Sequence, residues 1–132
     1  MTYRTVKQLV RRSGVVALPG TATVREASQL MTEHHIGAVL VMAEARLEGI
    51  FTERDALSRV LAKQKDPDET PIAEVMTRDL VTVEPRTTAV DALRLMNEIG
   101  FRHLPIVEEG HVYGIISLRD FIGAEFQLAG KL

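Results

Sequence analysis

The hydrophobic and polar positions of the chain follow one pattern that occurs twice. Each copy begins with a short helical turn and a short apolar strand, and continues with an amphipathic helix, two apolar strands and a last helix. These elements are predicted at residues 6–11, 15–18, 23–34, 38–42, 47–51 and 52–63, and again at residues 72–76, 81–83, 88–99, 104–107, 112–116 and 117–128. The strands are continuous apolar runs, which is typical of sheets covered on both faces.

The two amphipathic helices carry start signals as well as an apolar face. In both, apolar residues recur at i, i+3 and i+4, which indicates one buried helix face. Thr23 and Thr88 are predicted to be N-caps, and Glu26 and Asp91 lie three residues later as their capping-box partners.

A sequence repeat underlies this pattern. Residues 23–55, shifted by 65 positions, align with residues 88–120 without a gap and with ten identical pairs. An internal repeat of this kind is a strong indicator of fold. The order β-α-β-β-α, present twice, predicts an α+β fold of two units, residues 1–66 with the N-terminal helical turn and residues 67–132. We expect the units to pack pseudo-symmetrically, sheet to sheet, as one module.

Composition and charge narrow the classes of function. The 132 residues have a net charge of −2 and no cysteine, so a disulfide framework and thiolate chemistry are absent. The sequence has no basic stripe and no apolar run near the roughly 18–20 residues that span a bilayer, so we expect neither a nucleic-acid nor a membrane partner. Because no targeting segment is evident, we expect a cytoplasmic protein.

Catalytic and metal sites are not indicated either. Acid–base catalysis needs converging carboxylates, or a histidine beside a nucleophile, and no such grouping is evident, so we expect no enzyme activity. His34 and His35 are adjacent, and adjacent helical residues point about 100° apart, so they do not form a natural chelating pair. We therefore expect no metal site.

Each copy ends its third strand in the same polar cluster, glycine, two hydrophobic residues, Ser or Thr, two further residues and Asp. Thr52 and Asp55 belong to the first cluster, and Ser117 and Asp120 belong to the second. Helix capping alone explains these residues, because the hydroxyl caps the helix and the acid completes a capping box. The same geometry also suits a nucleotide, with phosphate at the helix N-terminus and ribose hydroxyls on the carboxylate.

Taken together, the motifs resemble a paired CBS-domain module, the nucleotide-sensing tandem named after cystathionine β-synthase. The resemblance rests on both polar clusters, on Ile72, Val75, Met76 and Thr77 before the second copy, and on the run GFRHLPIV at residues 100–107. It extends over roughly residues 6–128 and implies a stand-alone regulatory or sensor module. Such a module would bind adenine-containing nucleotides in clefts between its units, and would signal through an altered arrangement of the units or of a homodimer to an unidentified regulated protein.

The resemblance also implies roles for individual residues. Asp55 and Asp120 would hold ribose hydroxyls, and Thr52 and Ser117 would contact phosphate or the edge of the ribose. Adenine would lie against the backbone of the first strand and the start of the second strand of each unit. The residues concerned are Val16, Ala17, Ile36 and Ala38 in the first copy and Thr82 and Leu104 in the second.

Basic residues distinguish the two copies. Arg102 and His103 match the family position where basic side chains face phosphates, and Arg119 is a further candidate phosphate contact. The first copy has no arginine at the equivalent position, so we expect the stronger site at Asp120. The basic pair favours a phosphate-bearing nucleotide over S-adenosylmethionine. We expect AMP, with ATP, ADP or NAD(H) as alternatives.

The alternative hypothesis is a ligand-free structural or interaction module, in which the two polar clusters are only helix caps. The predicted last helix, residues 118–128, is apolar enough for a homodimer contact, although its side chains would equally complete the core. The residues alone do not decide between these hypotheses.

Overall fold

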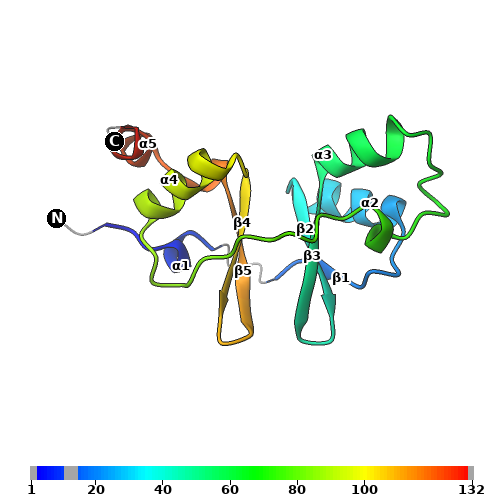
Figure 1. Cartoon of the computed structure of the whole chain (residues 1–132), viewed down its shortest axis with the longest axis horizontal. Coiled ribbons are helices and arrows are strands. Elements are labelled where there is room, and N and C mark those ends of the chain that lie inside the picture. Colours follow the sequence, from blue (N-terminus) through cyan, green and yellow to red (C-terminus); the bar gives the residue numbers. More distant parts are fainter. Residues whose placement is uncertain (1–2, 11–14, 131–132) are drawn as a thin grey trace. The chain divides into compact units, whose positions relative to one another are not determined.

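A computed structural model of the chain describes residues 3–10 and 15–130 (Figure 1). The strands are β1 (Ala17–Leu18), β2 (Ala38–Ala43), β3 (Arg46–Thr52), β4 (His103–Glu108) and β5 (His111–Ser117). The α-helices are α1 (Val6–Leu9), α2 (Val24–His34), α3 (Glu53–Asp55), α4 (Ala89–Ile99) and α5 (Gly123–Ala129). A π-helix, η1 (Ala56–Leu61), and two 3-10 helices, η2 (Ile72–Glu74) and η3 (Leu118–Asp120), complete the described elements. This mixture of helices and small sheets is the α+β class that the sequence predicted.

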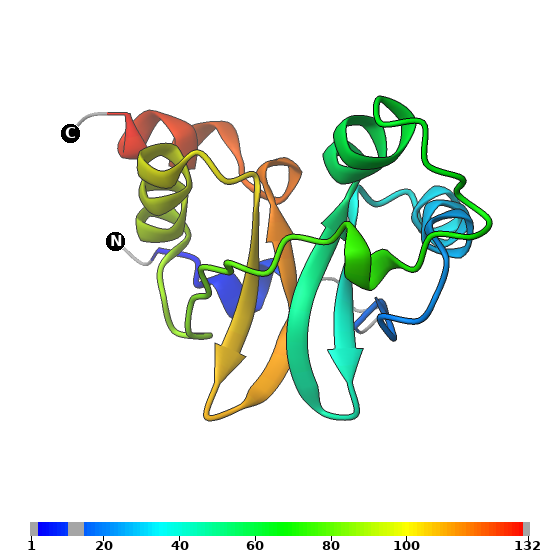
Figure 2. The same cartoon turned by 45° about the vertical axis from the view of Figure 1, so that its right-hand side comes forward.

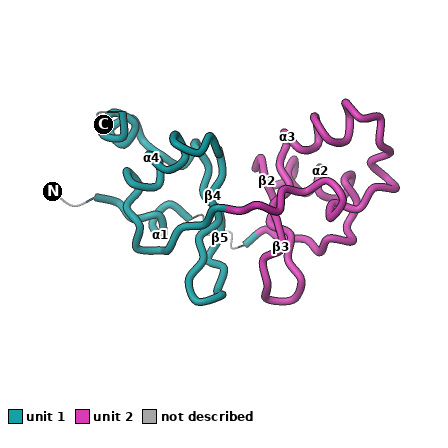
Figure 3. The backbone as a smooth tube through the Cα atoms, in the orientation of Figure 1, with its two compact units in different colours: residues 1–15, 81–132 teal, residues 16–80 magenta. Residues whose placement is uncertain are grey.

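The chain forms two compact units that differ from its sequential halves. One unit contains residues 1–15 and 81–132, and the other contains residues 16–80 (Figure 3). The leading segment of each copy is the part before its first strand, up to residue 15 in the first copy and residues 67–80 in the second. Each leading segment therefore packs with the other copy of the repeat. The predicted division at residue 66 separates the two sequence repeats, whereas the packing units are divided near residues 15 and 80.

Backbone hydrogen bonds explain why the leading segments pack in this way. In the 16–80 unit, Val24 N donates to Thr70 O at 3.0 Å and Ile72 N donates to Ala22 O at 2.8 Å. In the other unit, Val6 N donates to Thr87 O and Ala89 N donates to Arg4 O, both at 2.8 Å. In each unit the leading segment thus pairs with the turn that begins the amphipathic helix.

The 16–80 unit is built on the three-stranded sheet β1-β2-β3, beside which α2 lies (Figure 2). β1 is parallel to β2, and β2 is antiparallel to β3, with Ala38 opposite Thr52. Buried side chains from the sheet, α2 and η2 form one core, whose members include Met31, Val39, Phe51 and Ile72. This core fixes the end of β3, where the first polar cluster lies.

The other unit contains the antiparallel pair β4-β5, in which His103 lies opposite Ser117. The strand predicted at residues 81–83 is wrong, because only Val83 forms a bridge, parallel to Ile106. In the first copy, Leu40 N donates to Val16 O at 3.1 Å and so extends the pairing of β1. The residue aligned with Leu40 is Pro105, which has no N–H to donate, and the parallel pairing is shorter here.

The glycine of each polar cluster permits a close approach of the leading segment. A Cβ atom on Gly49 would lie 2.6 Å from Met76 Sδ and 2.8 Å from Thr77 O, and one on Gly114 would lie 2.9 Å from Val10 Cγ1. Met76 and Val10 occupy equivalent places before the two copies of the repeat. The glycines therefore have a packing role in both units.

Helix starts and ends agree only in part with the predictions. Thr23 and Thr88 are N-caps, and their hydroxyls accept from the amides of Glu26 and Asp91, each at 3.1 Å. The last helix predicted at residues 52–63 consists of α3 followed by the π-helix η1. The one predicted at residues 117–128 is wrong as a continuous helix, because Phe121 has extended backbone angles between η3 and α5.

Candidate functional site

The first polar cluster forms the predicted capping box at the end of β3. Asp55 N donates to Thr52 Oγ1 at 3.1 Å, and Thr52 N donates to Asp55 Oδ2 at 3.0 Å. Thr52 still has extended backbone angles, so the chain turns from strand to helix within one residue. The predicted capping box is confirmed here, and it leaves Asp55 Oδ1 for other partners.

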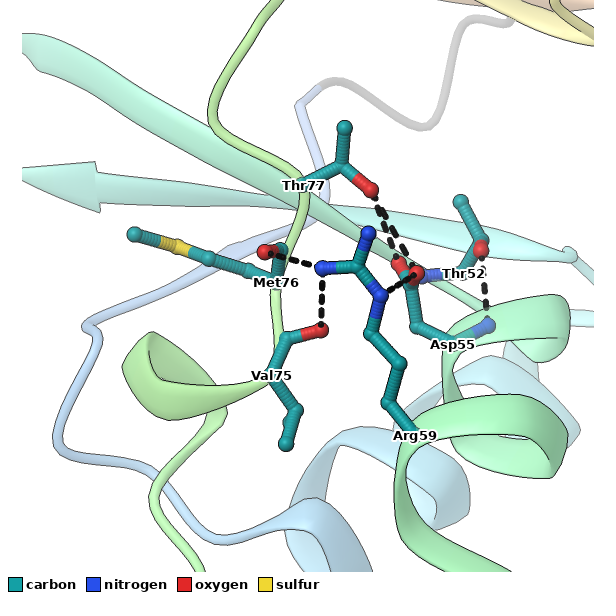
Figure 4. A network of polar contacts seen from close by, with 6 residues as sticks. All are labelled: Thr52, Asp55, Arg59, Val75, Met76 and Thr77. Carbon is teal, nitrogen blue, oxygen red and sulfur yellow. Dashed lines mark hydrogen bonds and ion pairs between the residues drawn. The ribbon is translucent and has the colours of Figure 1, made fainter. Parts of the chain in front are cut away.

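The Asp55 carboxylate has two further partners, which come from other parts of the unit (Figure 4). Thr77 Oγ1 lies 3.3 Å from Asp55 Oδ1 and 3.5 Å from Oδ2, and Arg59 Nε lies 3.5 Å from Oδ1. Arg59 Nη1 also donates to the carbonyl oxygens of Met76 at 3.0 Å and Val75 at 3.5 Å. With a side chain only 8% exposed, Asp55 is the buried centre of a network that joins β3, η1 and the segment 75–77.

Arg59 was not predicted as a site residue, and Thr77 was predicted only as part of the family motif. The spacing of Asp55 and Arg59 is i, i+4, which places two helical side chains on the same face and is a signal for an ion pair. The contact with Thr77 has no such local signal, because 22 residues separate it from Asp55.

The second polar cluster is built in a similar way but has different neighbours. Ser117 N donates to Asp120 Oδ2 at 2.7 Å, and Ser117 Oγ lies 3.4 Å from the same oxygen. Both residues are half-buried, whereas Asp55 is buried. The residue aligned with Arg59 is Ala124, whose side chain has no donor. The two candidate ribose carboxylates therefore differ in burial and in the residue four positions later in the sequence.

An ion pair beside the second cluster was not predicted. Arg4 donates to the Glu125 carboxylate from Nη2 at 2.7 Å and from Nε at 3.0 Å, and Nη2 also donates to the backbone oxygen of Asp120 at 3.1 Å. The Arg4 hydrogen bonds hold the pKa of Glu125 below its ordinary value, assisted by the Ile122 amide and opposed by burial. The same pairing raises the pKa of Arg4. Asp120 is thus positioned through its backbone as well as through its own carboxylate.

The remaining candidates of the first copy lie around the Asp55 cluster or along the neighbouring strands. Ala38 is opposite Thr52 in the sheet, and Gly37 O accepts from Glu53 N at 3.0 Å, so the start of β2 adjoins the start of α3. Ile36 is half-buried just before β2. Val16 and Ala17 are half-buried further along the sheet, where Ala17 is opposite Leu40.

The candidates of the second copy fall into two groups. His103 is opposite Ser117 in the sheet, and the exposed Arg102 precedes it, so both belong to the end of the sheet that carries Asp120. Arg119 is exposed on η3. Leu104 is fully buried, and Thr82 is exposed one residue before Val83.

Within residues 3–10 and 15–130, no group of three or more His, Asp or Glu side chains is placed to hold a metal ion. No helix in these same ranges is long and apolar enough to cross a membrane.

Comparison with known proteins identifies the family. The family model described as CBS domain matches residues 6–62 and 72–126, so the chain belongs to the CBS-domain family and carries two CBS domains. The CBS domain-containing protein YhcV of Bacillus subtilis is 37% identical over 106 residues, which are 80% of this chain and 75% of that protein. The Arabidopsis thaliana protein CBSCBSPB1 is 38% identical over 116 residues, and this chain spans only 21% of its length.

Solved structures share the fold over nearly the whole chain. The crystal structure of the CBS domain NE2398 has a TM-score of 0.82 and 37% identity, covering 90% of this chain and 94% of that one. The CBS domain protein PAE2072 from Pyrobaculum aerophilum, complexed with AMP, has a TM-score of 0.84 and 25% identity, covering 97% and 99%. Tandem CBS domains are generally regulatory and bind adenosine ligands.

Proposed function

We propose that this protein is a regulatory module that binds an adenine nucleotide through its two polar clusters. The observation that carries the proposal is the group formed by Ser117, Asp120 and His103 at one end of β4 and β5, with the exposed Arg102 beside it. A carboxylate, a hydroxyl and two basic side chains match the ribose and phosphate of a nucleotide. The AMP complex of PAE2072, a protein of the same fold, supports this assignment.

In this proposal the ligand is AMP, with ADP, ATP and NAD(H) as alternatives. Asp120 accepts from the ribose hydroxyls, Ser117 contacts phosphate or the ribose edge, and Arg102, His103 and Arg119 face the phosphates. Backbone groups of Thr82 and Leu104 contact adenine. In the first copy the equivalent set is Thr52, Asp55, Val16, Ala17, Ile36 and Ala38.

Regulation would follow from differential binding, since a ligand shifts a conformational equilibrium only as far as its affinity differs between the two states. We propose that the shifted equilibrium is that of a homodimer and of its contact with a regulated protein. Exposed apolar side chains near the ends of both copies, Leu57 and Leu61 on η1 and Ile122 and Phe126 at α5, provide surface for such a contact. The proposal includes no catalytic step.

The alternative, a ligand-free module with capping clusters, is favoured by one observation in the 16–80 unit. There the chain itself supplies donors to both oxygens of the Asp55 carboxylate. At the second cluster Asp120 Oδ2 accepts from Ser117 N, and Ala124, at the position aligned with Arg59, has no side-chain donor. The alternative therefore has more support at the first cluster than at the second.

A thermal-shift panel on nucleotide-stripped protein tests the proposal, with AMP, ADP, ATP, NAD, NADH and S-adenosylmethionine each at millimolar concentration. A micromolar ligand at that excess stabilises the protein by about 4 kcal/mol, which raises the Tm by many degrees. We expect the shift with AMP to be lost in Asp120→Ala. Asp91→Ala is the matched control, because Asp91 is the third residue of α4, as Asp120 is of η3.

Selective loss of the shift in Asp120→Ala, with retention in Asp91→Ala, would support the nucleotide site. The absence of any shift across the panel would instead favour the ligand-free module.

A further inference from the structure

In the first copy, Arg59 contacts the Asp55 carboxylate, which a nucleotide would need for its ribose. Its Nε lies 3.5 Å from Asp55 Oδ1, and Thr77 Oγ1 lies 3.3 Å from the same oxygen. Asp55 Oδ2 is bonded by Thr52 N at 3.0 Å. A carboxylate has about four acceptor sites and three are already engaged, so a ribose, which presents two vicinal hydroxyls as donors, would have to displace at least one of Arg59 and Thr77.

The backbone around Arg59 differs from an ordinary α-helix. Arg59 lies within the π-helix η1, which begins directly after Asp55. Single-turn π-helices are rare and occur frequently at functional sites. From this turn Arg59 reaches both the Asp55 carboxylate and the carbonyl oxygens of Val75 and Met76, so three acceptors hold one guanidinium in place.

The contact between Arg59 and Asp55 is long enough, and the Arg59 side chain is exposed enough, for a ligand to displace Arg59 from the carboxylate. The Arg59 side chain is 51% exposed, while that of Asp55 is 8% exposed. The Arg59–Asp55 pair has a half-exposed cation and an N–O distance of 3.5 Å, so solvent screens it and it contributes little free energy. Arg59 is therefore suited to act as a competitor that a ligand can replace.

We infer that Arg59 is an internal competitor that lowers nucleotide affinity at the Asp55 site and so sets the order in which the two sites fill. This inference deepens the proposed function and rests on it. Ala124 stands at the aligned position of the second copy and cannot compete. The chain would then bind its first nucleotide at Asp120, and the Asp55 site would fill only at higher concentration.

The test uses AMP and isothermal titration calorimetry on the full chain. Asp120→Ala serves as the background, so that binding reports the Asp55 site. Adding Arg59→Met, which keeps the aliphatic stem, is expected to tighten AMP binding about two- to fivefold. Arg46→Ala in the same background is the matched control, because it removes one positive charge from the opposite end of β3, where Arg46 pairs with Glu48.

Tighter binding with Arg59→Met but not with Arg46→Ala would support the competitor. Unchanged or weaker binding with Arg59→Met would overturn it, and weaker binding would make Arg59 a phosphate ligand instead. Should circular dichroism show that Arg59→Met is unfolded, Thr77→Val removes the other displaced donor and carries the same expectation. If the wild-type chain binds no AMP, the proposed function fails for AMP; if it binds AMP while Arg59→Met has no effect, only this inference fails.

Discussion

Arg4 and Glu125, 121 positions apart in the sequence, are joined by two hydrogen bonds of 2.7 and 3.0 Å. The Glu125 carboxylate is buried and also accepts from Ile122 N at 2.9 Å, the bond that restarts the helix as α5. One ion pair thus fixes the N-terminal segment, the backbone of Asp120 and the start of the last helix.

Removal of Arg4 should destabilise the protein measurably. Arg4→Ala leaves the buried Glu125 carboxylate without its cation, while the partial exposure of Arg4 moderates the loss. We expect the free energy of unfolding to fall by about 1–3 kcal/mol, measured by urea denaturation. Arg86→Ala is the control, because its pair with Glu84 is exposed and should contribute less than about 1 kcal/mol. Equal losses of unfolding free energy in the two variants would contradict the larger contribution of the Arg4–Glu125 pair.

The same ion pair predicts a pH dependence of stability. Because the folded-state pKa of Glu125 is lowered, its contribution is fully present above the unfolded-state pKa of about 4.3 and is lost as the pH falls through the folded-state pKa. The difference in unfolding free energy between the wild type and Glu125→Gln should therefore be largest near neutral pH and shrink at acidic pH. Urea titrations between about pH 7 and pH 3 measure this difference. A difference that is constant with pH would count against the ionised pair.

Pro105 is predicted to limit the parallel pairing of the 81–83 segment. Pro105→Leu introduces the residue that the first copy has at position 40 and supplies an amide N–H facing the Val81 carbonyl. We expect this new amide to be protected in hydrogen exchange followed by NMR. The net stability should change by less than about 1 kcal/mol, because the gained hydrogen bond is offset by a more flexible unfolded chain. Rapid exchange of the new amide would refute the explanation.

Gly49 should tolerate a side chain poorly. In Gly49→Ala the new Cβ would lie 2.8 Å from the backbone oxygen of Thr77, which is held by Ile50 N at 3.0 Å and has little freedom to move. A loss of about 1–3 kcal/mol in unfolding free energy is expected. Gly123→Ala is the control, since no atom lies within 4 Å of its added Cβ, and it should be neutral or slightly stabilising. A neutral Gly49→Ala would mean that the leading segment can shift.

The sequence by itself determined the repeat, the order of the elements, both polar clusters and the family. These features depend on periodicity and on spacings of a few residues, such as the capping box between Thr52 and Asp55, so local patterns were sufficient to find them. The short pairing at Val83 was missed because it depends on one absent N–H on a neighbouring strand, at Pro105.

Only the tertiary structure decided which segments pack together and which partners the clusters acquire. The exchange of leading segments, the Arg4–Glu125 pair and the contact of Thr77 with Asp55 join residues far apart in the sequence. The hydropathy pattern shows that a segment is to be buried, but it does not show which unit buries it. The backbone hydrogen bonds and close glycine contacts within each unit determine which segments pack together. They also give Asp55 and Asp120 different surroundings.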